Sequence, residues 1–453
     1  MSEHARISTV GWIRSSVTFK LILIAGIILA LLIPATMMTS LVRERNKRSD
    51  SVIGEVSGKW GSAQTVTGPV LSVPFFAKME DDDGKIHLVE KNLHFLPDDI
   101  RIDGDLATQE RHRGIYRTIL YGATLSIKGE FPNPMLEELD SSVQAVDAVE
   151  WDRAFVSLGI SDMKGIREEI AAVVGGEPVE MNPGIHVKEL ISSGVTARVP
   201  LRREAERIPF EFTVELSGSQ QVQFVPVGRA TSVHLESEWP HPSFNGEFLP
   251  VESTITENGF GADWKVLHLN RNYPQSWVGD AHSIADSGFG VELLIPVDIY
   301  RKTMRTLKYA TIFLAFTFMV LFFSEIMNGR PIHPLQYLLI GFAVSIFYAL
   351  LLSIAEFLGF GLAYLISSAV ILALIAAYTS GVTGSRRVTS VVTAVLGVLY
   401  GYLYLVLQMD DYALLMGSVG LLAALAGVMY LTRSIDWYSI RLEEEPKSVR
   451  ESP

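Results

Sequence analysis

Two histidines and two glutamates lie close together between positions 234 and 241 and have the chemistry of metal ligands. His234, Glu236 and Glu238 occupy alternate positions of a predicted strand, and His241 follows them. Alternate side chains of a strand share one face, and imidazole with carboxylate suits zinc or manganese. A metal-dependent hydrolase is therefore one hypothesis. A polar, solvent-facing strand explains the first three residues equally well, because Pro240 is expected to end the strand before His241.

The same stretch contains a rigid aromatic turn that could contact another protein. It consists of Trp239, Pro240, His241, Pro242 and Phe244. Exposed aromatic side chains anchor many interfaces, so this turn is the candidate partner-binding site. The alternative, which we favour, is a corner packed into the core of its own domain.

Other motifs of catalysis or metal binding are missing from the sequence. Asp81, Asp82 and Asp83 lack the spacing of an EF-hand loop and suit the tip of a hairpin instead. Neither a Gly-x-Ser-x-Gly elbow, nor a His-Glu-x-x-His helix, nor a phosphate-binding loop occurs. There is no cysteine, which excludes disulfides and thiolate chemistry. We therefore predict a protein that is not an enzyme and that uses no cofactor.

These residues fall within a predicted β-rich region, 43–308. Its short apolar segments alternate with polar residues or are rich in Val, Ile, Phe and Tyr, as strands are. Asp83–Gly84 and Asp103–Gly104 suit hairpin turns. Helices are expected only over 135–149 and over 161–173, the second capped by Ser161 or Asp162. So many short strands must bury a face against one another, which predicts a β-sandwich.

Apolar runs of bilayer length flank this region on both sides. A transmembrane helix needs about 20 mostly apolar residues, and the run 21–42 is too long for a cleaved signal peptide, so it is expected to be an uncleaved anchor. Five more runs follow the β-rich region. The six predicted spans are 21–42, 309–327, 335–354, 359–378, 388–409 and 412–431. Pairs of glycines at 397 and 401 and at 417 and 420 would let the last two helices approach closely.

Charges in the short loops set the predicted orientation. Arg386 and Arg387 fall on one side of the membrane, whereas Glu356 and the Asp410–Asp411 pair fall on the other. Basic residues in short loops face the cytoplasm. We therefore expect the segments 1–20 and 432–453 to be cytoplasmic and the β-rich domain to lie outside the cytoplasm. Glu325 is expected near the interface, at the end of its span, so that no span has a charge at its centre.

The composition is that of an α+β membrane protein. Of the 453 residues, 48% are hydrophobic, which suits a membrane domain beside a large folded domain. The net charge of −12 argues against a nucleic-acid partner, which would require a basic surface. The expected partners are the phospholipid bilayer and an envelope protein or lipid.

Three stretches resemble one family. They are Leu-Pro-Asp-Asp at 96–99, Glu-Arg-His-Arg-Gly-Ile-Tyr at 110–116 and Ser-Glu-Trp-Pro-His-Pro-Ser-Phe at 237–244. In these stretches, and in the block from 290 to 438, the chain is similar to the CreD inner membrane proteins. The resemblance implies a multi-pass protein of the bacterial inner membrane with its large domain in the periplasm. It also implies a link to envelope integrity and envelope stress, with colicin tolerance and β-lactam response among the associations, but no known reaction, ligand or functional residue.

Three functions remain as hypotheses, in this order. The first is a non-enzymatic envelope protein whose periplasmic domain binds an envelope component while the helices anchor it. The second is a transporter or channel for a lipid, an ion or a small solute, although such proteins usually have broken helices or buried charges near the midplane. The third is the metal-dependent periplasmic hydrolase that would use His234 and His241.

Overall fold

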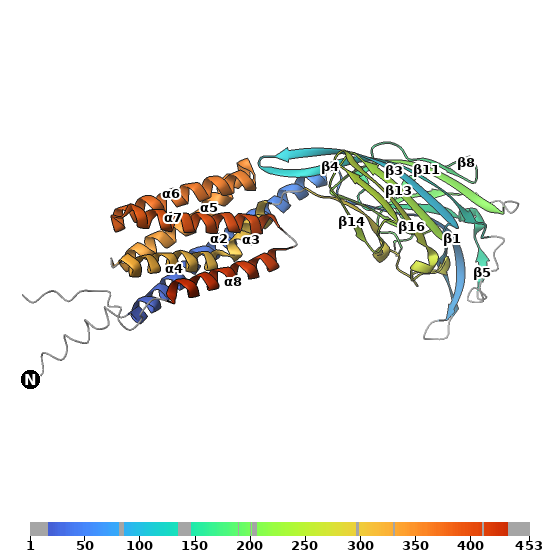
Figure 1. The fold of residues 1–453 in the computed structure, drawn as a ribbon. Helices are drawn as coiled ribbons and strands as arrows, with labels where there is room; N and C mark the ends of the chain where they lie inside the picture. Colours follow the sequence, from blue (N-terminus) through green and yellow to red (C-terminus); the bar gives the residue numbers. More distant parts are fainter. Residues whose placement is uncertain are drawn as a thin grey trace, which may run out of the picture. The chain divides into compact units, whose positions relative to one another are not determined.

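The computed structural model describes residues 17–80, 86–134, 146–188, 190–199, 201, 206–295, 299–328, 331–409 and 412–433. The chain divides into two compact units. One unit is helical and comprises Met1–Arg48 and Val297–Pro453, and the other is β-rich and comprises Ser49–Pro296. Figure 1 labels the helices of the helical unit and several strands of the β-rich unit.

The β-rich unit contains two mixed sheets. The first sheet has ten strands. Seven of them follow the order β14-β18-β12-β1-β6-β10-β9, and β2, β5 and β17 pair off this path. They are β1 (Gln64–Glu80), β2 (Ile86–Phe95), β5 (Val146–Val149), β6 (Phe155–Ile160), β9 (Asn182–Pro183), β10 (Gly194–Arg198), β12 (Gln221–Val225), β14 (Pro242–Gly246), β17 (Ser276–Val278) and β18 (Phe289–Leu293). The pairing of β1 with β12 is parallel, and the other pairings in this sheet are antiparallel.

The second sheet has eight strands in the order β15-β16-β13-β3-β4-β11-β7-β8. They are β3 (Asp99–Arg113), β4 (Tyr116–Pro132), β7 (Ala171–Val174), β8 (Glu177–Pro178), β11 (Arg207–Ser219), β13 (Ala230–Ser237), β15 (Glu252–Thr256) and β16 (Gly259–Leu267). Four short 3₁₀ turns lie between the strands: η2 (Trp151–Arg153), η3 (Met163–Gly165), η4 (His268–Asn270) and η5 (Ala285–Ser287).

The two sheets pack face to face as a sandwich. In β11 the side chains of Ile208, Phe210, Phe212 and Val214 are buried and alternate with exposed ones, as expected for a strand with one face on a core. Residues of both sheets belong to one apolar cluster. Between the sheets, the ring centroid of Trp264 in β16 lies 6.0 Å from that of Phe289 in β18. Burial between the sheets therefore holds this unit together.

Two expectations for the interior of the β-rich region are wrong. The Asp103–Gly104 pair is not a turn but lies within β3, where a Cβ at Gly104 would come within 2.6 Å of the Leu235 side chain, so the glycine serves packing. Residues 161–173 do not form a helix. They contain only η3, with the Asp162 carboxylate accepting from the Lys164 amide at 3.1 Å, and the start of β7, because Ala172 and Val174 are buried beside β11.

The limits of the β-rich region also differ from 43–308. Helix α2 (Val17–Trp60) begins before the predicted span and continues past residue 42, and the first strand begins at Gln64. The i,i+4 pair of Glu55 and Lys59, 2.9 Å apart, stabilises the charged end of this helix. At the other limit, residues Ile299–Lys308 form helix α3. Of the expected helix over 135–149, residues 146–149 are strand β5, and the rest lies outside the described residues, as do Asp81–Asp83 and Gly84.

The helical unit contains long apolar helices that run alongside one another as a bundle (Figure 1). After α2 and α3 come α4 (Ala310–Asn328), α5 (Pro334–Leu358), α6 (Phe360–Thr383), α7 (Arg386–Gln408) and α8 (Ala413–Thr432). By length and composition, four helices of the described chain could cross a membrane, or five if α3 and α4, which meet at a bend of 48°, count as one. Helix α8 is a shorter apolar helix over Leu414–Tyr430.

Aromatic side chains fill the centre of the helical unit. The ring of Tyr400 in α7 lies 4.5 Å from that of Phe313 in α4 and 5.1 Å from that of Phe347 in α5. The Tyr364 hydroxyl of α6 donates to the Tyr400 carbonyl at 2.8 Å. Of the four glycines expected to allow close packing, only Gly420 has a near neighbour, the Tyr402 ring, 2.5 Å from where its Cβ would be.

Candidate functional site

The predicted partner-binding turn is a corner of the sandwich. The Trp239 indole donates to the Leu294 carbonyl at 3.0 Å. The Phe244 ring, in β14, lies 5.8 Å from the Phe260 ring and 5.5 Å from the Trp264 ring across the core. His241 is exposed at the same corner, with its ring edge-on to Trp239 at 6.1 Å. This is the packed arrangement that we favoured from the sequence, and the partner-binding role stays a prediction.

Of the predicted metal ligands, His234 and Glu236 bond to each other, whereas His241 lies beside Trp239. The His234 ring bonds on one side to Asp263, with Nδ1 and Oδ1 2.8 Å apart, and on the other to Glu236, with Nε2 and Oε1 3.1 Å apart. The bond with Asp263, more than that with Glu236, raises the pKa of His234 above its usual value, although partial burial opposes it. Among the described residues, no group of three or more His, Asp or Glu side chains is placed to hold an ion.

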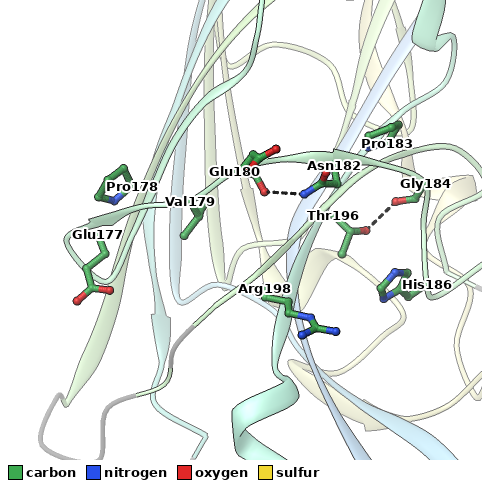
Figure 2. A pocket seen from close by; sticks show the side chains of 10 residues that line it. All are labelled: Glu177, Pro178, Val179, Glu180, Asn182, Pro183, Gly184, His186, Thr196 and Arg198. Atoms are coloured by element: carbon green, nitrogen blue, oxygen red, sulfur yellow. Dashed lines mark hydrogen bonds between the residues drawn. The ribbon is translucent and has the colours of Figure 1, made fainter.

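A polar cavity of about 460 Å³ opens in the β-rich unit beside strands β8, β9 and β10 (Figure 2). We call it the 177–198 pocket. Its lining residues are Glu177, Pro178, Val179, Glu180, Asn182, Pro183, Gly184, His186, Thr196 and Arg198.

Two hydrogen bonds fix the shape of the 177–198 pocket. The Thr196 hydroxyl donates to the Gly184 carbonyl at 2.9 Å, and the Asn182 side-chain amide donates to the Glu180 carbonyl at 3.4 Å (Figure 2). Thr196 is buried in β10, which pairs with β9 and so places Asn182 opposite it. The chain thus presents polar side chains on a wall that hydrogen bonds hold in place.

The 177–198 pocket offers charges of both signs. Glu180 and Arg198 are exposed there, and neither side chain makes an ion pair with another residue in the described part of the chain. A guanidinium binds carboxylate or phosphate groups, and a carboxylate accepts from ammonium or hydroxyl groups. His186, exposed with its ring 5.2 Å from that of Phe155, adds an imidazole. The arrangement suits a polar ligand that has both donors and acceptors.

Sequence reasoning missed the 177–198 pocket because no spacing rule joins its parts. Residues 177–186 come after a segment that was expected to be helical, and Thr196 and Arg198 reach them only through the pairing of β9 with β10. The signal that could have found it is the density of Gly and Pro from 175 to 184, which is typical of irregular chain that carries binding residues.

The helical unit contains a buried ion pair that the sequence did not predict. Glu325 of α4 is 2% exposed and accepts hydrogen bonds from Lys20 of α2 and, at 2.9 Å, from the Tyr337 hydroxyl of α5. Lys20 also donates to the Ile332 carbonyl at 3.0 Å. Glu325 lies in the last turn of α4, as expected, and its carboxylate is enclosed by partners from other helices. Its expected position near the membrane interface stays a prediction. A small cavity of about 210 Å³ adjoins it, lined by polar residues that include Ser324, Asn328 and Ser385.

Glu356, near the end of α5, also has partners. Its carboxylate accepts from the Tyr300 hydroxyl at 3.2 Å and lies 4.0 Å from the Arg45 guanidinium. Both contacts lie within the helical unit. Arg45 supplies the opposite charge and Tyr300 a hydrogen bond to this acidic residue, which was expected at the turn after the helix.

The apolar bundle and the β-sandwich together define an integral membrane protein with a large folded domain outside its helices. The chain belongs to the CreD family, since the family model described as "Inner membrane protein CreD" matches residues 16–438. It is similar to the inner membrane protein CreD of Escherichia coli (strain K12), with 30% identity over 438 residues that cover 95% of this chain and 96% of that protein. The resemblance inferred from the sequence is therefore confirmed.

Solved structures add little to this assignment. The M1 zinc metallopeptidase from Deinococcus radiodurans is 9% identical, with a TM-score of 0.19, and the match covers 38% of each chain. A mutant of that enzyme is 10% identical at the same TM-score and coverage. At such scores the similarity carries no argument about fold or activity.

Proposed function

We propose that this chain is a non-enzymatic inner-membrane protein that contributes to envelope integrity and to the envelope-stress response. In this proposal six spans cross the membrane, both termini are cytoplasmic, and the periplasmic β-sandwich binds a polar envelope component in the 177–198 pocket. The observation that carries the proposal is the pocket itself, which presents exposed charges of both signs on a hydrogen-bonded wall.

Loop charges support the orientation. Arg386 and Arg387 are exposed at the start of α7, just after one end of α6. The acidic residue Glu356, which pairs with Arg45, lies just before the other end of α6. Basic residues are retained on the cytoplasmic side. Counting the bent pair of α3 and α4 as one span, and α8 as another, completes six and leaves both chain ends on the same side.

The charges of the pocket indicate the class of ligand. A free guanidinium at Arg198 calls for a carboxylate or phosphate, and Glu180 calls for an ammonium or several hydroxyls. A saccharide carrying a short peptide, as in fragments of the cell wall, has all of these groups. An apolar ligand would leave the pocket charges without partners, at a cost in binding free energy.

Binding of soluble disaccharide-peptide fragments to the purified full chain tests this proposal. We expect Arg198→Ala and Glu180→Ala each to weaken binding about tenfold, since a hydrogen bond to a charged group contributes about 1.5–3 kcal/mol. Arg101→Ala is the matched control, because Arg101 is an exposed arginine of the same unit that pairs with Asp103 at 3.1 Å and lies outside the pocket. Equal binding by all three variants, or no binding by the wild type, would contradict the proposal.

The buried Lys20–Glu325 pair favours transport as a second candidate. Ionisable residues within membrane helices often mark ion or proton pathways, and a polar cavity adjoins this pair. Flux of protons or small ions in proteoliposomes that Glu325→Gln abolishes would move transport into first place.

The hydrolase hypothesis, by contrast, loses its motivation because both His234 nitrogens already bond to carboxylates.

A further inference from the structure

An apolar groove of about 440 Å³ runs between helices α4, α7 and α8. Each helix contributes one face to it. Ile312, Phe316 and Phe323 are on the α4 face, Val395 and Leu399 are among those on the α7 face, and Gly417, Ala424 and Val428 are on the α8 face. The lining contains no charged side chain.

Helix α8 contacts α7 at Gly420 and Met416. The Tyr402 ring lies 2.5 Å from where a Cβ on Gly420 would be, and the Tyr402 hydroxyl donates to the Met416 carbonyl, so these contacts hold α7 and α8 together. Gly417 and Gly427 also line the groove, and a Cβ on either would meet nothing within 4 Å. Gly420 lines the groove too, but the Tyr402 ring blocks its Cβ position, whereas the Cβ positions of Gly417 and Gly427 are open.

The length of the groove matches one leaflet of a bilayer. Its lining runs from Ile312 to Phe323 on α4 and from Gly417 to Val428 on α8, which is eleven steps along the helix in each case. Eleven steps of α-helix extend about 16 Å, and half of the hydrocarbon core measures about 15 Å. An acyl chain that lies along the helices would fill such a space.

A cation marks one end of the groove. Lys308 is exposed and directly precedes Tyr309, which lines the groove, and it makes no ion pair with another described residue. The amphipathic helix α3, which carries Lys308, buries Thr303, Thr306 and Leu307 and meets α4 at a bend of 48°. Short basic amphipathic helices of this kind lie at the membrane interface and attract anionic lipids.

We propose that the groove binds one acyl chain of an anionic glycerophospholipid, whose headgroup pairs with Lys308. The occupant must be apolar along its whole length, since the groove offers no charge, and anionic at the Lys308 end. Surrounding lipid satisfies both conditions in an inner-membrane protein. This site is independent of the polar ligand proposed for the β-sandwich.

Native mass spectrometry of the detergent-purified full chain tests the site, with phosphatidylglycerol and phosphatidylcholine as probes. The groove-filling variant is Gly417→Leu with Gly427→Leu. Its matched control is Gly397→Leu with Gly401→Leu, on α7, where an added Cβ also meets nothing within 4 Å but lies outside the groove lining. We expect the filled groove to retain less phosphatidylglycerol, by a factor of more than about ten. Loss of the burial of two or three methylene groups of the acyl chain is enough for such a change. The control should retain it.

Lys308→Gln tests the headgroup contact without altering the groove. We expect this variant to retain phosphatidylcholine as the wild type does and to lose its preference for phosphatidylglycerol. Retention of lipid by the groove-filling variant, or an unchanged lipid preference in Lys308→Gln, would overturn the proposal. The proposal would also fail if the wild type is a dimer in lipid-free detergent and the groove-filling variant is a monomer, because a second copy of the chain would then occupy the groove.

Discussion

Lys20 in α2 donates a hydrogen bond to the carboxylate of Glu325 in α4, although 305 residues separate them in the sequence. The pair joins the first helix to the helices after the β-sandwich within one compact unit. Burying two charges is costly, and the cost is offset only when partners satisfy them, as the Tyr337 hydroxyl and the Ile332 carbonyl do here.

Breaking this pair on one side should destabilise the helical unit. We expect Lys20→Met or Glu325→Gln to lower the free energy of unfolding by about 3 kcal/mol, because one buried polar group loses its partner. The double variant should recover part of that loss. Thermal unfolding in detergent measures it, with Lys128→Met and Glu211→Gln as the control on an exposed pair, where about 0.5 kcal/mol or less is expected. A similarly small loss of stability at both pairs would contradict the conclusion that Lys20 and Glu325 form a buried ion pair.

His94 should make the stability of the β-sandwich depend on pH. Its imidazole is buried, with Nδ1 2.9 Å from the Ser72 hydroxyl oxygen, and burial lowers the pKa of His94 to about 4. The unfolded chain binds this proton below about pH 6.5. The unfolded state therefore holds more protons between these values, and the free energy of unfolding falls as pH falls, by roughly 3 kcal/mol across the window.

The variant His94→Asn should remove this part of the pH dependence. Melting temperatures of the full chain at pH 7 and pH 4.5 provide the comparison, and His112→Asn, at an exposed histidine, is the control. If His94→Asn loses as much stability on acidification as the wild type does, the imidazole is not the source.

Gly104 should tolerate no larger side chain. A Cβ there would lie 2.6 Å from the Leu235 side chain and 2.9 Å from that of Leu125, so we expect Gly104→Ala to cost about 1–3 kcal/mol. Gly122→Ala, in the neighbouring strand β4, meets nothing within 4 Å and should change stability by less than about 1 kcal/mol. Equal melting temperatures for the two variants would show that the core accommodates the methyl group at both positions.

Two substitutions at the 239–244 corner test its packing role and its binding role separately. Phe244→Ala should destabilise the sandwich by about 2 kcal/mol, since the ring is half-buried against Phe260 and Trp264. His241→Ala, at an exposed position, should leave the melting temperature unchanged. A loss of envelope integrity in cells carrying His241→Ala would therefore indicate a partner at this corner, whereas an unaltered phenotype would count against one.

Local patterns in the sequence predicted much of the fold. The alternation in β11 and the apolar runs that became α5, α6 and α7 could be recognised because burial on one face or on all faces leaves a period in the sequence. Asp103–Gly104 misled the prediction because the same dipeptide suits a turn or a close approach between side chains, and only the facing Leu235 decides between them. Residues 161–173 do not form the expected helix because the chain turns at η3 and, from Ala171, pairs with β11, which overrides a helical preference.

The candidate sites depended on contacts between distant parts of the chain. Glu325 had no visible partner in the sequence because Lys20 lies before the entire β-sandwich. Asp263, which bonds His234, comes from the neighbouring strand β16 and follows no motif. The acyl-chain groove involves three helices whose apolar residues are individually ordinary for a membrane span. Pairing and packing of this kind can be stated only once the fold is known.

The absence of cysteine gives a direct test of where the β-sandwich lies, because a single introduced thiol can be labelled without background. Ser253→Cys, at an exposed position of strand β15, and Arg387→Cys, at the exposed start of α7, are suitable sites. In intact spheroplasts, a membrane-impermeant maleimide should label Ser253→Cys, and it should label Arg387→Cys only after the membrane is permeabilised. Labelling of Arg387→Cys in intact cells, with Ser253→Cys protected until permeabilisation, would contradict the proposed periplasmic binding domain.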